Sequence, residues 1–184
     1  SELIAPAEVF SLAGDFDIKL ISVEQVPTIR TEEGIQISVD ATIEDDLTLD
    51  VLLVPGGNDM SHLLQHDKLN AFIQKQANAA QWLGSFCAGA FVLGNAGVLD
   101  DTQATTWFGG ESSLQAQFPA IQVVHDKPVV MDNRRITSNG GLVSYRAALM
   151  LLAQLRGTEK AKQVYHNLSL DRIGTWQEIQ AQLA

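Results

Sequence analysis

The sequence contains a single cysteine, Cys87, among 184 residues. One thiol cannot form a disulfide within the chain, and a domain of this length buries about 70% of its unfolded surface without such links. Because proteins without disulfides are typical of reducing compartments, we predict a cytoplasmic location. The thiol of Cys87 is then free to react.

Basic residues and long apolar runs are also scarce. Twelve lysines and arginines stand against 22 aspartates and glutamates, which gives a net charge of -10. Such a surface repels a phosphate backbone, so no nucleic-acid partner is expected for this segment. No run approaches the roughly 18 to 20 apolar residues of a bilayer-spanning helix, and the start, SELIAPAEVF, lacks the features of a signal peptide, so no membrane partner is expected either.

Short apolar runs alternate with longer helical segments, the pattern of βα units around a mostly parallel sheet. No repeat, low-complexity tract or linker divides the chain, so residues 1–184 are predicted to form one α/β domain. Gly34 is predicted to turn a small antiparallel excursion, Asp67 to cap a helix and Gly157 to end one. The predicted strands are 18–23, 35–39, 50–54, 82–86, 121–124, 128–131 and 135–138, and the predicted helices are 6–13, 67–80, 88–96, 110–118, 141–156, 158–168 and 175–183.

The beginning of the chain departs from this pattern. A parallel α/β domain normally opens with a strand that leads into its first helix, whereas the first helix predicted here begins at Pro6. An uncovered central sheet edge is an aggregation hazard. We therefore expect a short strand of about five to six residues upstream of Ser1.

Cys87 lies in GSFCAGAFVLG, between a predicted strand and a predicted helix. Small neighbours such as Gly84, Ala88 and Gly89 suit a sharp elbow like the one that presents the nucleophile in G-x-S-x-G sequences. The carboxyl end of a parallel strand is also where open α/β sheets bind ligands. A free cysteine is often only a small core residue, but a helix N-terminus favours the thiolate, so the elbow favours a nucleophile active near pH 7.

A second turn, Pro55-Gly56-Gly57, follows the apolar strand predicted at 50–54. Bare glycines let backbone N–H groups approach a ligand or an oxyanion. By itself such a turn is weak evidence. Together with the elbow around Cys87 it predicts two strand ends that face each other across a cleft.

Other residues give weaker signals. His62 and His66 have helical metal-ligand spacing but no third ligand, so neither a metal nor another cofactor is expected. His125 follows the strand predicted at 121–124 and is the one histidine near a predicted strand end, which makes it a candidate partner for the thiol. Trp107 either lines the cleft or packs in the core.

The strings LLVPGG, GSFCAGAFVLGNAGVLDDTQATTWFGG and ITSNGGLVSYRAALMLLAQLRG resemble the ThiJ/PfpI superfamily, in its order and spacing and over essentially the whole chain. The resemblance implies a flavodoxin-like three-layer α/β sandwich, usually a homodimer, with a reactive cysteine at the elbow. It also implies a carboxylate four residues before a proline in the first helix. Glu2 precedes Pro6 by that interval, so we expect a protonated Glu2 to donate to the sulfur of Cys87.

The sequence also departs from several members of the superfamily. Its proteases carry a histidine directly after the cysteine, where this chain has Ala88, so peptide hydrolysis is not expected. Its glyoxalase-like members carry a histidine where this chain has Trp107. Its isonitrile hydratases use an aspartate and a threonine at the positions of Glu2 and Ala88. A general base would therefore have to be Glu2.

These features predict a hydratase, hydrolase or lyase for a small molecule, nearest to the isonitrile hydratases. Cys87 would attack, Glu2 would carry the proton, and the N–H groups of Gly57 and Ala88 would stabilise negative charge. The remaining predicted pocket residues are Gly56, Trp107 and His125.

Two alternatives remain open. One is a ligand-binding domain like the N-terminal half of AraC-type regulators, which carries similar CAGAFVL elbows; a DNA-binding domain would then lie downstream of Ala184. The other is a redox sensor in which peroxide converts Cys87 to a sulfinic acid.

Overall fold

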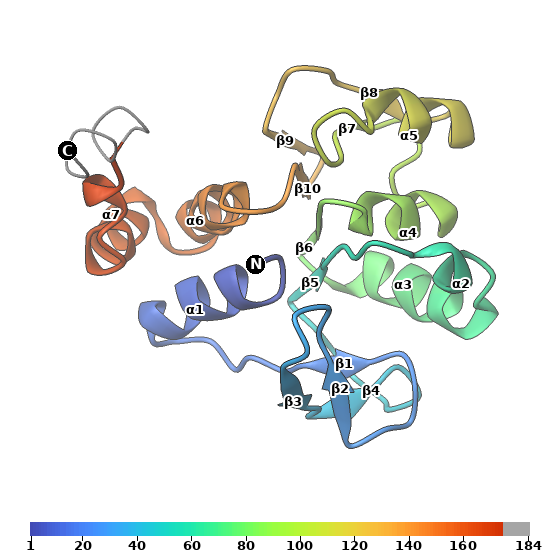
Figure 1. Cartoon of the computed structure of the whole chain (residues 1–184), viewed down its shortest axis with the longest axis horizontal. Helices are drawn as coiled ribbons and strands as arrows, with labels where there is room; N and C mark the ends of the chain where they lie inside the picture. Colours follow the sequence, from blue (N-terminus) through green and yellow to red (C-terminus); the bar gives the residue numbers. More distant parts are fainter. Residues whose placement is uncertain (175–184) are drawn as a thin grey trace.

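The structure, a computed structural model, describes residues 1–174 and consists of helices packed on both faces of a small β-sheet (Figure 1). The helix predicted at 175–183 lies outside the described residues. The main sheet has the strand order β5-β6-β10-β9, with β9 antiparallel to β10 and the other neighbours parallel. Its strands are β5 (Val51–Val54), β6 (Trp82–Phe86), β9 (Val129–Asp132) and β10 (Arg135–Ser138). The predicted mostly parallel sheet is therefore confirmed.

Two apolar cores cover the two faces of this sheet. Leu52 and Leu83 pack on one side, with the helices α3 (Asp67–Ala79) and α4 (Gly89–Asn95). Phe86 and Ile136 pack on the other side. The helices of that second layer are α1 (Ile4–Ala13), α6 (Val143–Arg156) and α7 (Thr158–Asn167). Because strand side chains alternate between these cores, the architecture is a three-layer sandwich.

The remaining strands form short pairs beside the main sheet. β1 (Ile21–Ser22) pairs with β4 (Ala41–Thr42), and β7 (Gln103–Ala104) pairs with β8 (Gln122–Val123), both parallel. β2 (Thr28–Arg30) and β3 (Gln36–Ser38) form an antiparallel hairpin that turns through Gly34, whose φ is 86°. The smaller helical elements are α2 (Ser61–Leu64), α5 (Glu111–Gln117) and the 3-10 helix η1 (Leu170–Arg172).

Two sequence predictions need correction here. The strand predicted at 18–23 contracts to β1, which pairs with β4 and stays outside the main sheet, whereas the antiparallel excursion predicted around Gly34 is confirmed as the β2–β3 hairpin. In the described part of the chain, β5 pairs with β6 alone, and the expected strand upstream of Ser1 stays a prediction. The cap of α3 is His66 rather than Asp67, because the imidazole Nδ1 accepts the N–H of Leu69 at 3.1 Å.

The predicted end of a helix at Gly157 is confirmed. Gly157 ends α6 with a φ of 88°, a left-handed conformation that glycine adopts without strain. His66, one of the two histidines with metal-ligand spacing, caps α3 through its imidazole and so has a structural role. Within residues 1–174, no helix combines the length and the apolar character needed to cross a bilayer.

Candidate active site

The chain bends sharply at Cys87, between the end of β6 and the start of α4. Cys87 has a φ of 54°, in the left-handed region that non-glycine residues adopt only at a cost. Two hydrogen bonds hold the bend: the Cys87 N–H donates to the Ser138 carbonyl at 2.9 Å, and the Thr106 hydroxyl donates to the Cys87 carbonyl at 2.9 Å. The predicted strand-turn-helix elbow is present, with the thiol half-buried.

The glycine turn after β5 packs directly against this elbow. A Cβ built on Gly56 would lie 2.5 Å from the nitrogen of Ala88 and 2.9 Å from the Cβ of Cys87. A Cβ on Gly89, in the first turn of α4, would collide with the carbonyl oxygen of Val54. Only glycine allows the two strand ends to approach this closely, so the two turns meet as predicted, but in direct contact rather than across a cleft.

Glu2 reaches the elbow from the turn before α1. Its Oε1 accepts the N–H of Gly141 at 2.8 Å, and its side chain is 24% exposed. A Cβ built on Gly140 would lie 2.8 Å from that Oε1 and 2.6 Å from the Cβ of Cys87. The carboxylate and the cysteine therefore meet at Gly140, although no hydrogen bond joins Glu2 to the sulfur among residues 1–174.

Glu32 supplies a second carboxylate that sequence reasoning missed. It lies in the turn of the β2–β3 hairpin, and its Oε1 accepts the N–H of Asn58 at 2.5 Å, while its Oε2 accepts the Asn58 side-chain amide at 2.8 Å. The same Oε1 lies 3.2 Å from a Cβ built on Gly57. Nothing in TEEG, an ordinary polar turn, indicates that it folds onto a loop 26 residues away.

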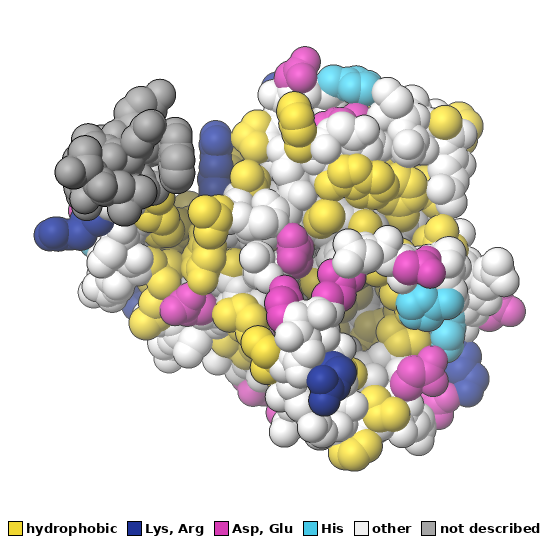
Figure 2. Space-filling model, in the orientation of Figure 1, with side chains coloured by type: hydrophobic (Ala, Val, Ile, Leu, Met, Phe, Trp, Pro, Cys, Tyr) yellow, Lys and Arg dark blue, Asp and Glu magenta, His cyan; other side chains and the backbone are white. Residues whose placement is uncertain are grey.

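Acidic side chains gather around the start of α1 and the carboxyl end of β5, near the centre of the face shown in Figure 2. Such a site repels anionic ligands more than neutral ones.

The other predicted pocket residues are placed less centrally. Trp107 stacks on Phe91 with ring centroids 4.9 Å apart and an interplanar angle of 20°, which favours core packing over a role in the chemistry. His125 is exposed in the loop between β8 and β9, and in the part of the chain that the structure describes no hydrogen bond joins it to the elbow. A Cβ built on Gly57 would lie 3.2 Å from the Oε1 of Glu32 and 3.4 Å from the sulfur of Met60.

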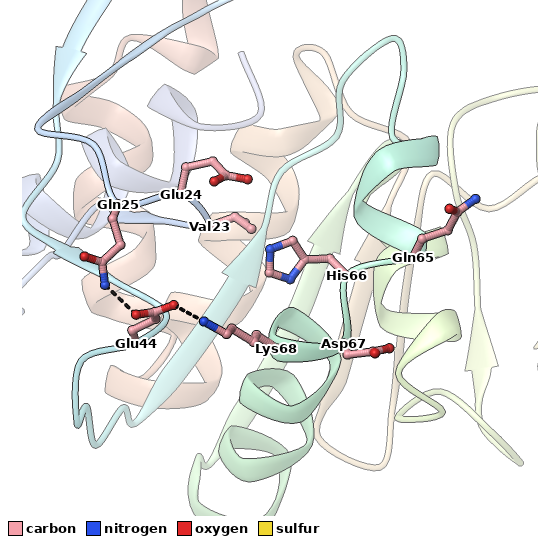
Figure 3. A pocket seen from close by; sticks show the side chains of 8 residues that line it. All are labelled: Val23, Glu24, Gln25, Glu44, Gln65, His66, Asp67 and Lys68. Atoms are coloured by element: carbon pink, nitrogen blue, oxygen red, sulfur yellow. Dashed lines mark hydrogen bonds and ion pairs between the residues drawn. The ribbon is translucent and has the colours of Figure 1, made fainter.

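A polar hollow lies at the start of α3, between residues 23–25, Glu44 and residues 65–68 (Figure 3). Lys68 and Gln25 both bond to the carboxylate of Glu44 across it. Cys87 and Glu2 are not among its lining residues. The hollow is thus separate from the elbow, and its one lysine is paired with Glu44.

Comparisons with known proteins identify the family of this chain. The profile of the DJ-1/PfpI family matches residues 1–154. The chain belongs to this family. Isonitrile hydratase of Pseudomonas putida is 32% identical over 164 residues, which cover 89% of this chain and 70% of that protein.

Further relatives of this DJ-1/PfpI chain differ in length. The HTH-type transcriptional regulator GbdR of Pseudomonas aeruginosa is 26% identical over 152 residues, but the match covers 83% of this chain and only 41% of the regulator. The crystal structure of a ThiJ/PfpI family protein from Pseudomonas syringae matches with a TM-score of 0.85 and 26% identity, over 95% of this chain and 72% of that one. The predicted family and the predicted α/β fold are both confirmed.

The charges around the DJ-1/PfpI elbow bear on one prediction, the protonated Glu2 beside a thiolate. Burial raises the pKa of the Cys87 thiol, and the negative charges of Glu2 and Glu32 raise it further. The N–H of Ala88 donates to the sulfur and lowers this pKa, but by less than the other effects raise it. Burial also opposes ionisation of Glu2, but the hydrogen bonds from the backbone N–H groups of Gly141 and of Glu2 itself act the other way, and the pKa of Glu2 lies below its usual value. These two pKa shifts favour a neutral thiol beside an ionised carboxylate over the predicted thiolate beside a protonated carboxyl.

Glu2→Gln is expected to speed the alkylation of Cys87 by iodoacetamide at pH 7. Removing a negative charge beside the sulfur makes the thiolate less unfavourable, so the pKa of Cys87 falls and the thiolate fraction at pH 7 rises. We expect an increase of about three- to fivefold, measured as the rate against pH. Glu8→Gln, the same change farther along α1 where the carboxylate bonds to Tyr145, is the control and leaves the rate unchanged. Slower alkylation of Glu2→Gln would contradict the ionised state of Glu2.

Proposed function

We propose that this DJ-1/PfpI domain is an isonitrile hydratase, which adds water to an isonitrile, R–N≡C, and releases the formamide R–NH–CHO. The observation that carries the proposal is the meeting of Glu2 and Cys87 at Gly140. The similarity to the Pseudomonas putida isonitrile hydratase supports the choice of substrate. An isonitrile is uncharged, so it suits a thiol flanked by the carboxylates of Glu2 and Glu32.

The first half of the reaction forms a covalent adduct. The Glu2 carboxylate takes the proton of the Cys87 thiol as the sulfur bonds to the terminal isonitrile carbon. Glu2 then returns this proton to that carbon, which gives the thioimidate R–N=CH–S–Cys87. A neutral thiol beside an ionised carboxylate suits this step, because the base is present before the substrate arrives.

The second half consumes water. A water molecule adds across the C=N bond, its hydroxyl to carbon and its proton to nitrogen, with Glu2 as the proton carrier. The tetrahedral intermediate then breaks its C–S bond, and its hydroxyl proton passes through Glu2 to the sulfur, so the formamide leaves and the thiol is restored. The N–H groups of Gly57 and Ala88 are the proposed donors to the developing negative charge; that of Ala88 already contacts the sulfur.

The test is turnover of a panel of aliphatic and aromatic isonitriles in water enriched in oxygen-18. We expect formamides that carry one labelled oxygen, detected by mass spectrometry, with enzyme-dependent rates. Dicarbonyl and amide substrates form the comparison panel. Absence of any formamide above the rate without enzyme would refute the hydratase proposal.

A ligand-binding domain is the second candidate, favoured by the similarity to the regulator GbdR. Trp107 packs on Phe91 and stands where other members of the family carry a histidine base. A site that only binds a ligand needs no such base. This candidate predicts small-molecule binding, measured by calorimetry, that persists in Cys87→Ala with no turnover by either protein. The redox alternative is less well supported, because the raised pKa of Cys87 keeps little of the easily oxidised thiolate at neutral pH.

A further inference from the structure

The glycine loop at the elbow has no regular structure of its own. Residues 55–60 link the end of β5 to α2, and Asn58 is exposed. At one end Gly56 contacts the Cβ of Cys87 and the nitrogen of Ala88. Farther along the loop, contacts from elsewhere in the fold hold Asn58.

The β2–β3 hairpin supplies such a contact. In the described part of the chain, both hydrogen bonds between the hairpin and this loop end on Glu32, whose two oxygens accept the backbone N–H and the side-chain amide of Asn58. A carboxylate that accepts two N–H groups of one residue fixes both the position and the orientation of that residue. The next residue, Glu33, bonds within the hairpin turn instead, to Thr31 and its own backbone.

We propose that Glu32 is a positioning residue for the reaction at Cys87: its clasp on Asn58 holds the glycine loop over the thiol, so that the N–H of Gly57 meets the charge that develops on the bound substrate. Glu32 acts through the loop and touches no reacting atom. Its carboxylate also faces the elbow as a second negative charge after Glu2, which disfavours anionic substrates there. This role rests on the proposed function of the elbow.

Three single variants separate the clasp from the charge. Glu32→Gln removes the negative charge and replaces one carboxylate oxygen, an acceptor for Asn58, with an NH₂ group that can only donate. We therefore expect kcat for an isonitrile to fall about tenfold, with KM changed less than twofold. Iodoacetamide alkylation at pH 7 should instead rise about twofold, because one charge that disfavours the thiolate is gone. Asn58→Ala keeps the charge, so kcat should fall about threefold with alkylation unchanged.

Glu33→Gln is the matched control, with the same change one residue along the same turn, and should leave both rates unchanged. The double variant Glu32→Gln with Asn58→Ala should behave like Glu32→Gln alone, because both changes break one clasp. Equal behaviour of Glu32→Gln and Glu33→Gln in both assays would overturn the proposal. So would full additivity of Glu32→Gln and Asn58→Ala.

Hydrogen exchange at the backbone N–H of Asn58 gives a readout that needs no turnover. Exchange should be at least about tenfold faster in Glu32→Gln than in the parent or in Glu33→Gln, since that N–H loses its charged acceptor. If no isonitrile is hydrated, the proposed function fails, while the exchange and alkylation rates still decide whether Glu32 holds the loop. Unchanged exchange in Glu32→Gln would refute the clasp even in an active enzyme.

Discussion

Cys87→Ala is expected to lower isonitrile hydration at least about 10⁴-fold, because the change removes the atom that forms the bond to carbon. Alanine fits the elbow: it is smaller than cysteine, and the hydrogen bonds with the Ser138 carbonyl and the Thr106 hydroxyl engage only the backbone of residue 87. The fold should therefore be retained, which circular dichroism and the melting temperature will check. The rate is measured as formamide formed per enzyme.

Cys87→Ser refines this result. Its hydroxyl occupies the same place but is a far weaker nucleophile than sulfur at neutral pH, so we expect activity near that of the alanine variant. If either variant kept more than about a tenth of the activity, sulfur could not be the nucleophile, since such a loss is far below what removal of a catalytic nucleophile costs.

Gly140→Ala is expected to lower turnover at least about 100-fold, because the new Cβ would lie 2.6 Å from the Cβ of Cys87 and 2.8 Å from the Oε1 of Glu2. The residue has a φ of 93°, so the methyl group also strains the backbone, and we expect a loss of about 1–3 kcal/mol in the free energy of unfolding. Turnover and denaturant unfolding measure the two effects separately.

Gly141→Ala is the matched control for this change. It places the same methyl group one residue along, where no atom lies within 4 Å, at a φ of 57° that alanine reaches at modest cost. The N–H that donates to Glu2 is unchanged. We expect turnover within about threefold of the parent. Similar losses in the two variants would show that strain in this turn, rather than separation of Glu2 from Cys87, causes the effect.

The sequence was most informative where local chemistry dictates the backbone. Cys87 among small residues and glycines after an apolar strand lead to one arrangement, since bulkier residues could not bring the two turns together. The strands predicted at 50–54, 82–86 and 135–138 were equally clear and agree with β5, β6 and β10 to within one residue. His66 displaced the predicted cap at Asp67 because an imidazole nitrogen can replace the usual oxygen acceptor.

What the sequence could not provide was contact over long separations. Glu2 and Gly141 are 139 residues apart, and only the resemblance to a family pointed to that carboxylate. No local pattern marked Glu32, and the ionisation of Glu2 depends on an N–H that tertiary folding brings to it. The cytoplasmic location, the homodimer and the strand upstream of Ser1 remain predictions.

The most direct test of the account is the intact mass of the protein, quenched with acid during turnover of an isonitrile. Because the proposed attack is an addition with no leaving group, the protein should gain the full mass of the isonitrile, located at Cys87 by peptide mapping and absent from Cys87→Ala. Formamide production with the protein mass unchanged throughout, or with the added mass at any other residue, would contradict the role of Cys87.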